Sequence, residues 1–239
     1  MSSTAWFAWN GVKSTAMGVD VQELPPITIP EERASFEEVS GRGGTIVRTE
    51  GAQIYSDMIL AAVCRTANPS DIPAIAQWLS GGGEVEFGNR PGGCYRARIV
   101  NQIEFARIVA SRPNREFTVN FRCQPGWLHS DAADVTVTQS GTLVNNPGTL
   151  PSLPRVEIHG SGDFALTIGL QTVFLAGLTD GIILDSRLGD GLTLDGYGLL
   201  NDHWDGDILR IQPGANAVSW VVESGSVTSI KITPRWMSL

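Results

Sequence analysis

The sequence has few of the motifs on which enzymes and membrane proteins depend. No apolar run approaches the roughly 18 residues that a membrane-spanning helix needs. The three cysteines are far apart and include no CxxC pair, which argues against a zinc site. There is no GxSxG motif, no GKS/T motif and no paired Ser/His/Asp pattern. We therefore expect no catalytic, cofactor-binding or metal-binding residues, and we expect that the protein is not an enzyme.

Charge is scarce and unevenly spread. Charged residues make up 18% of the chain, and the formal net charge is −8. Residues 1–127 carry 12 basic and 13 acidic side chains, whereas residues 128–239 carry 5 and 12. This asymmetry favours two domains, which we place at 1–130 and 131–239. An acidic protein does not bind DNA by neutralising phosphates.

The first residues lack the basic start and apolar core of a signal peptide, so we expect a protein that is not secreted.

Glycine and proline are abundant, with 27 and 13 residues, and they separate short segments rich in β-branched residues. This composition predicts a turn-rich, mainly β protein. The stretch SGRGGT at 40–45 could in principle be a phosphate-binding loop or a turn. Strand-like segments flank it and no helix follows, so its glycines predict a turn between strands.

One helix is predicted near residues 70–80, in NPSDIPAIAQWLSGGG. Its apolar residues recur at helical spacing, Ser70 or Asp71 is placed to cap it, and Gly81 is placed to end it. We expect this helix to lie across a sheet, and we expect Trp78 to pack there and not to bind a ligand.

Seven arginines lie between Arg90 and Arg122, against two glutamates. Strand alternation in YRARI puts Tyr95 and Ala97 inside and Arg96 and Arg98 outside. This pattern fits either a nucleic-acid strip or a subunit-facing strand whose arginines pair with carboxylates. The absence of interleaved aromatic residues favours the second interpretation. Our candidates for a subunit interface are therefore these exposed arginines and nearby acidic residues: Arg96, Arg98, Glu84 and Glu86, with Glu37 and Glu38 as further acceptors.

Beyond a linker near residues 128–140, short predicted strands recur every 8–12 residues, which is typical of a β-sandwich or jelly roll. RVEIHG and FALTIG are predicted as separate strands, as are AVSWVVES and TSIKITPRW. Two site hypotheses arise in this half. The aspartates could bind calcium, although most lie in turn peptides that Asp stabilises by itself; they are Asp185, Asp190, Asp195, Asp202, Asp205 and Asp207. Tyr197, Trp204 and Trp220 could form a platform for a sugar, although Trp220 fits the core better.

The order of the motifs resembles the distal tail proteins of long-tailed, siphovirus-like bacteriophages. An aromatic-NG opening (FAWNGV) is followed by MGVDV, SGRGGT, IYSDMIL and AQWLSGGG. YRARI and FTVNFRCQP complete the first domain, and the second opens near GTLVNNPGTLPSLPRVEIHGSGD and closes with PGANAVSW and ITPRW. The match covers nearly the whole chain, and its specificity lies in the ordered set of motifs.

The resemblance implies two β-sandwich domains, the first with one added helix and the second galectin-like. It also implies a hexameric ring that joins the tail tube protein to the tail tip or hub protein and to receptor-binding or baseplate proteins. DNA would pass through the channel without specific binding. The protein would be made in the host cytoplasm and located in the virion, at the distal end of the tail, with no membrane insertion. A carbohydrate-binding β-sandwich module is the alternative function.

Overall fold

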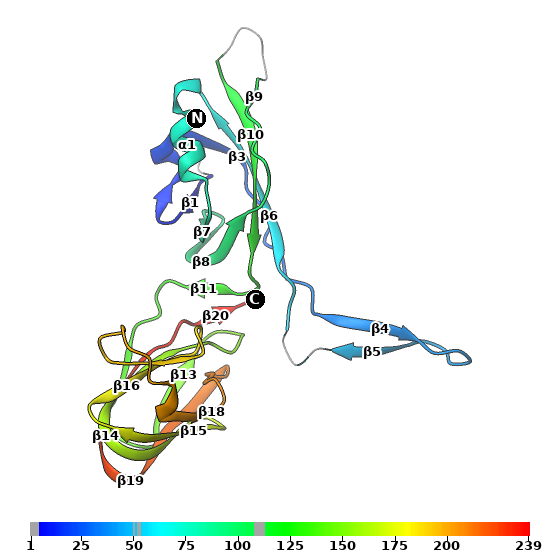
Figure 1. Cartoon of the computed structure of the whole chain (residues 1–239). Coiled ribbons are helices and arrows are strands. Elements are labelled where there is room, and N and C mark those ends of the chain that lie inside the picture. The colour runs from blue at the N-terminus through cyan, green and yellow to red at the C-terminus, as the bar shows by residue number, and fades with distance from the viewer. Residues whose placement is uncertain (1–4, 50, 52–53, 108–112) are drawn as a thin grey trace. The chain divides into compact units, whose positions relative to one another are not determined.

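The computed structural model describes residues 5–49, 51, 54–107 and 113–239. The chain divides into two compact units, one of Met1–Ser130 with Leu239 and one of Asp131–Ser238. Neighbouring strands along the main path of each sheet are antiparallel, and α1 (Ile72–Trp78) is the α-helix of the described residues (Figure 1). This confirms the predicted mainly β fold with one added helix. No helix in the described ranges has the length and apolar character needed to span a membrane.

The first unit is built on one curled sheet. Its strands follow the order β2 (Val12–Lys13), β1 (Phe7–Trp9), β7 (Gly82–Phe87), β8 (Arg90–Ile99), β10 (Arg115–Cys123), β6 (Met58–Thr66) and β3 (Val19–Glu23). Two short strands extend it: β9 (Ala106–Arg107) pairs with β10, and β11 (Trp127–His129) pairs with β8. The sheet forms because apolar residues alternate along its longer strands and give it one apolar face.

Aromatic rings fill the core of the first unit. The ring of Phe121 lies 5.3 Å from that of Phe7, 5.5 Å from that of Trp9 and 5.7 Å from that of Phe87. Trp78, the last residue of α1, stacks on Phe7 at 5.4 Å, so this helix packs on the apolar side of the sheet. Short 3-10 helices, η1 (Ser14–Met17) and η2 (Pro69–Asp71), complete the unit.

The helix is shorter than its sequence pattern indicates. Asp71 occupies the N-cap position but makes no side-chain capping hydrogen bond. At the other end, the backbone leaves the helix at Leu79, two residues before Gly81, and the Leu79 amide closes the last turn on Ile75. This helix of about two turns is stabilised mainly by Ile75 in the core and Trp78 packed against it, since an isolated helix of this length is not stable in water.

A hairpin of β4 (Ala34–Glu38) and β5 (Thr45–Thr49) forms a separate two-stranded sheet (Figure 1). Glu38 pairs with Thr45, so the glycine-rich stretch is the turn between the strands, as predicted. Gly41 and Gly44 both have φ of +82°, a conformation that glycine adopts at little cost.

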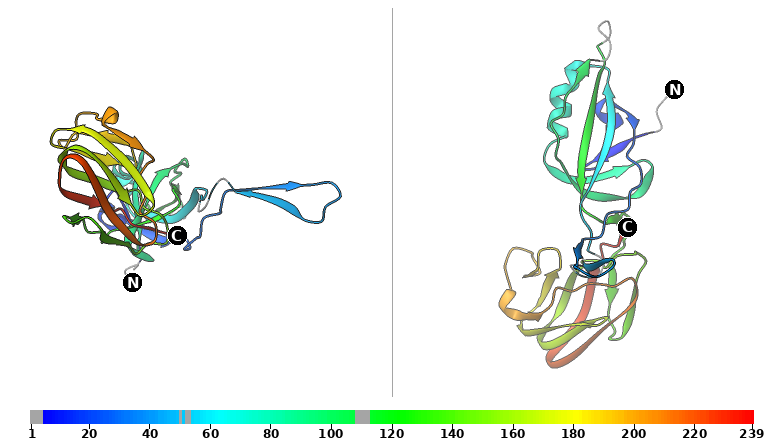
Figure 2. Two further views of the ribbon diagram at one scale, coloured as in Figure 1. Left: turned by 90° about the horizontal axis from the view of Figure 1, so that it is seen from below. Right: turned by 90° about the vertical axis from the view of Figure 1, so that its right-hand side faces the viewer.

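The second unit is built on another curled sheet, with the order β12 (Val135–Val137), β19 (Gly214–Thr233), β14 (Arg155–Ile168), β15 (Gln171–Leu178) and β18 (Trp204–Gly206). Further strands attach to this path: β13 (Thr142–Asn146) pairs with β19, β16 (Gly181–Asp185) pairs with β14, and β17 (Asp190–Leu192) pairs with β16. The remaining elements are η3 (Asn201–His203) and β20 (Met237–Ser238). Figure 2 shows the curl of the sheet from two further directions.

Two long, bent strands replace four of the short strands predicted for this unit. RVEIHG and FALTIG both belong to β14, which has 14 residues, and the last two predicted segments belong to β19, which has 20. Irregular pairing near His159 and Asp163 bends both strands, so that residues from both halves meet in one core. At this bend Gly162 and Gly225 lie back to back with positive φ, and a Cβ on Gly162 would lie 2.2 Å from the Ser224 carbonyl oxygen.

Candidate subunit interface

The predicted arginines lie on the outer face of the first sheet. On β8, Tyr95 and Ala97 are buried whereas Arg96 and Arg98 are exposed, as the alternation predicts. Arg98 is in register with Arg122 on β10 on one side and with Gly82 on β7 on the other. In the next row, Arg96 is in register with Glu84.

A groove of about 690 Å³ runs over these rows. Gly82 is the partner of Arg98 on β7 and contributes no side chain to the outer face, which leaves space beside Arg98. The groove residues are Asp57, Gly82, Gly83, Glu84, Arg96, Ala97, Arg98, Val100, Arg122 and Gln124. We call this surface the arginine groove.

The arginine groove has charge that the chain itself leaves unpaired. Arg122 forms an ion pair with Asp57 at 2.8 Å, but the arginine side chain is 60% exposed, so the pair contributes at most about 1 kcal/mol. Within the described ranges, Arg96 and Arg98 form no ion pair. Like charges placed directly opposite on neighbouring strands destabilise a sheet. A carboxylate placed between Arg98 and Arg122 would therefore stabilise this part of the sheet by offsetting their repulsion.

The structure brings three of the four predicted interface residues together. Arg96, Arg98 and Glu84 line the groove, whereas Glu86 does not, because its carboxylate faces the Gly92 amide at 3.4 Å. Sequence reasoning missed the contributions of Arg122 and Gly82. The alternation in REFTVNFRC could have placed Arg122 on the outer face, but the register that sets it opposite Arg98 depends on long-range pairing.

The hairpin carries a second uncovered surface. Phe36 and Val47 are directly opposite each other, on the same face of the two-stranded sheet, and are 68% and 55% exposed. Glu38 lies on that face as well, two residues along β4 from Phe36. On the other face, Glu37 forms an ion pair with Arg48 at 2.8 Å. We call the face of Phe36, Glu38 and Val47 the hairpin face.

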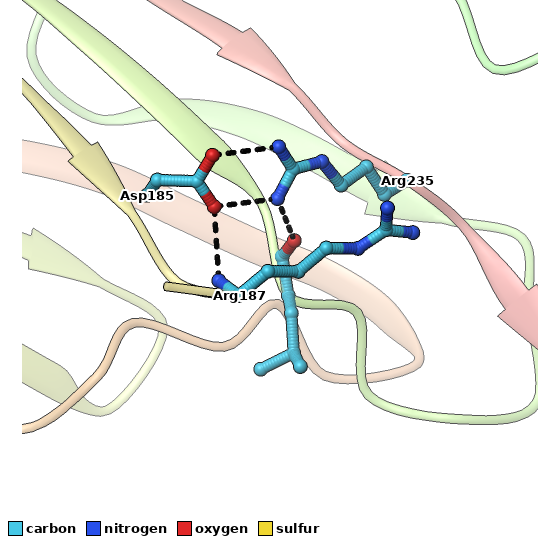
Figure 3. A network of polar contacts seen from close by, with 4 residues as sticks. Asp185, Arg187 and Arg235 are labelled. Carbon is cyan, nitrogen blue, oxygen red and sulfur yellow. Dashed lines mark hydrogen bonds and ion pairs between the residues drawn. The ribbon is translucent and has the colours of Figure 1, made fainter. Parts of the chain in front are cut away.

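In the second unit, several aspartates of the calcium hypothesis have partners within the chain. Asp185 accepts two hydrogen bonds from Arg235, at 2.7 and 2.8 Å, and one from the Arg187 amide at 3.0 Å (Figure 3). Asp195 accepts hydrogen bonds from the Thr193 hydroxyl and the Tyr197 amide of its own turn. No group of three or more His, Cys, Asp or Glu residues that could hold a metal ion occurs in the part of the chain described.

The carboxyl group of Asp185 is held in its ionised form. Burial on its own would raise the pKa of Asp185, but the hydrogen bonds from Arg235 and from the Arg187 amide, with the Arg235 charge, lower it below its ordinary value. The side chains are only 19% (Arg235) and 8% (Asp185) exposed. Each charge is compensated by the other within the chain, so removing either partner would leave a buried charge without its counterion.

The three aromatic residues of the sugar hypothesis have different surroundings. Trp204 and Trp220 pack partly against the core of the second unit, and the indole N–H of Trp204 donates to Asn201 at 3.4 Å. Tyr197 is 92% exposed on a turn. No ring contact joins any two of the three in the described residues, and Tyr197 is the most exposed of them.

The chain is similar to known proteins in its structure and not in its sequence. No protein-family model matches the sequence, and no curated protein matches it significantly. Among solved structures, the Dit protein of phage SPP1 matches with a TM-score of 0.72 at 16% identity, covering 95% of this chain and 97% of that one. The chain shares the fold of SPP1 Dit. That protein is described as a paradigm of the hub adsorption apparatus in phages that infect Gram-positive bacteria.

A second solved structure, the baseplate of phage p2 in its activated conformation, matches at 8% identity with a TM-score of 0.48 over 90% of each chain. The match to SPP1 Dit spans both units. The resemblance to distal tail proteins seen in the sequence is thus confirmed at the level of the fold.

Proposed function

We propose that this chain is a structural distal tail protein of a long-tailed bacteriophage. Six copies form a closed ring that connects the tail tube to the tail tip or baseplate and the receptor-binding apparatus. The observation that carries the proposal is the fold shared with SPP1 Dit over 95% of the chain, in a sequence whose motifs occur in the order typical of distal tail proteins.

The surface of the first unit gives physical support for assembly. A soluble protein that remains a single copy rarely leaves paired apolar side chains uncovered, as Phe36 and Val47 are on the hairpin face. The unpaired Arg96 and Arg98 are suited to a subunit interface, because the guanidinium group pairs bidentately with a neighbour's carboxylate. A ring also covers exposed strand edges, which otherwise promote aggregation.

The ring has a connecting role and no catalysis. Its partners are the tail tube protein, the tail tip or hub protein and receptor-binding or baseplate proteins, and it lies at the distal end of the tail in the virion. DNA passes through the channel without specific binding, because arginines paired between subunits are not available to retain its phosphates.

Light scattering after size exclusion tests the assembly. The chain has a mass of 25.6 kDa, so a hexamer has a mass of about 154 kDa. We expect that mass for the wild type, and a folded, smaller species with an unchanged circular dichroism spectrum for R96E/R98E. Full-size rings in the double variant would show that these arginines do not face a neighbour. A wild type of 25.6 kDa at every concentration and salt would refute the ring for the isolated protein.

The alternative, a carbohydrate-binding module, is favoured by one feature, the exposed ring of Tyr197. An exposed aromatic face can stack on a sugar ring. Stoichiometric binding of a glycan by a monomeric protein, lost in Tyr197→Ala, would support this alternative over the ring.

A further inference from the structure

The arginine groove combines three guanidinium groups with the carboxylates of Asp57 and Glu84. A continuous polyanion such as a nucleic acid would meet both carboxylates as well as the arginines. A protein segment with one carboxylate and neighbouring apolar groups fits better, because it can pair with an unpaired arginine and cover the apolar Val100, which is 48% exposed at the end of the groove.

The hairpin face has that chemistry. Glu38 forms no ion pair within the described residues, unlike its neighbour Glu37, which is bound to Arg48 on the opposite face. Phe36, two residues before Glu38, supplies the apolar group. The hairpin therefore carries, on one face, a free carboxylate and an uncovered ring.

The spacings of the two surfaces agree. Residues two apart on a strand point to the same face and lie about 6.6–6.8 Å apart. The same distance separates Phe36 from Glu38 on β4. It is also the expected distance between Arg98 and Val100, which lies just beyond the end of β8. A hairpin packed face to face on the sheet can thus place Glu38 against Arg98 while Phe36 covers Val100.

We propose that the hairpin face of one copy binds in the arginine groove of a second copy, with Glu38 paired to Arg98. This inference rests on the proposed ring and identifies the element that joins neighbouring subunits. It also accounts for the facing Arg98 and Arg122, because the incoming carboxylate offsets the repulsion between them. The contact is heterologous, since a hairpin meets a groove, and heterologous contacts build a closed ring when the rotation from one copy to the next closes on itself.

A charge exchange tests the pairing. Glu38→Arg and Arg98→Glu are each expected to raise the concentration at which the assembly dissociates by about tenfold or more, as measured by light scattering. The double variant E38R/R98E restores the pair with its charges exchanged, and we expect it to assemble again. Dissociation by both single variants without recovery in the double variant would overturn the Glu38–Arg98 pairing.

Two neighbouring glutamates supply a matched control. Glu38→Gln and Glu37→Gln make the same chemical change on opposite faces of one strand. We expect E38Q to weaken assembly and E37Q to leave it unchanged, with equal circular dichroism spectra. Equal behaviour of the two variants would contradict the assignment of the hairpin face.

The outcomes also separate this inference from the proposed function. A wild type that never assembles refutes the ring itself. A wild type that forms hexamers which E38Q, E38R and R98E all leave intact refutes only the hairpin contact. Tight binding of a short DNA duplex at about 150 mM salt, lost in R98E while assembly is retained, would assign the groove to nucleic acid instead.

Discussion

Removing Arg235 should destabilise the second unit strongly at neutral pH. Arg235→Met keeps most of the side-chain volume but takes two charge-assisted hydrogen bonds, at 2.7 and 2.8 Å, away from Asp185. Removing one partner of a buried ion pair costs about 3–5 kcal/mol, because it leaves an uncompensated charge. Since Asp185 keeps the Arg187 amide as a donor and Arg235 is 19% exposed, we expect about 3 kcal/mol.

Hydrogen exchange with mass spectrometry can assign this loss to one unit of the full chain. A loss of about 3 kcal/mol corresponds to roughly 100-fold faster exchange through opening of the second unit, seen in peptides of β14 and β19. Peptides of the first unit should be unaffected. As a control, Lys231→Met removes the partner of Asp134, an ion pair in which both side chains are more than 40% exposed, and should cost less than about 1 kcal/mol.

The pH dependence has a definite sign. The pKa of Asp185 is lowered in the folded protein, so its contribution to stability is full above the ordinary value of 3.8 and is lost as pH falls through the folded pKa. The difference in unfolding free energy between wild type and R235M should therefore shrink as pH falls below 3.8. D185L/R235M, with neither charge, should recover much of the loss at neutral pH. A double variant as unstable as R235M would refute this explanation.

Two further predictions concern the core of the first unit. Phe121→Ala removes a fully buried ring that contacts Phe7, Trp9 and Phe87, and should cost about 3–5 kcal/mol, with faster hydrogen exchange confined to first-unit peptides. Burial raises the pKa of Cys64 and of Cys123 to about 12, and the Asp57 charge contributes further to the shift of Cys123. Neither thiol should therefore react with iodoacetamide at about pH 8 until the protein is unfolded. Rapid alkylation of both thiols in the folded protein would contradict the burial.

The features predictable from the sequence are those that depend on local periodicity. The alternation in YRARI placed Arg96 and Arg98 outside, and the flanks of SGRGGT identified a turn. The prediction divided each of the long strands β14 and β19 into two, because glycine in a sequence pattern usually indicates the end of a strand. Here Gly162 and Gly225 lie at a bend within the strands. The groove could not be predicted, since it depends on Arg98 meeting Arg122 and Gly82, which are distant in sequence.

Negative-stain electron microscopy of the purified wild-type protein tests the ring directly. We predict closed rings with six-fold symmetry and a central channel wide enough for duplex DNA. Class averages that show only single copies, open chains or particles without a channel, at every protein concentration tested, would contradict the ring.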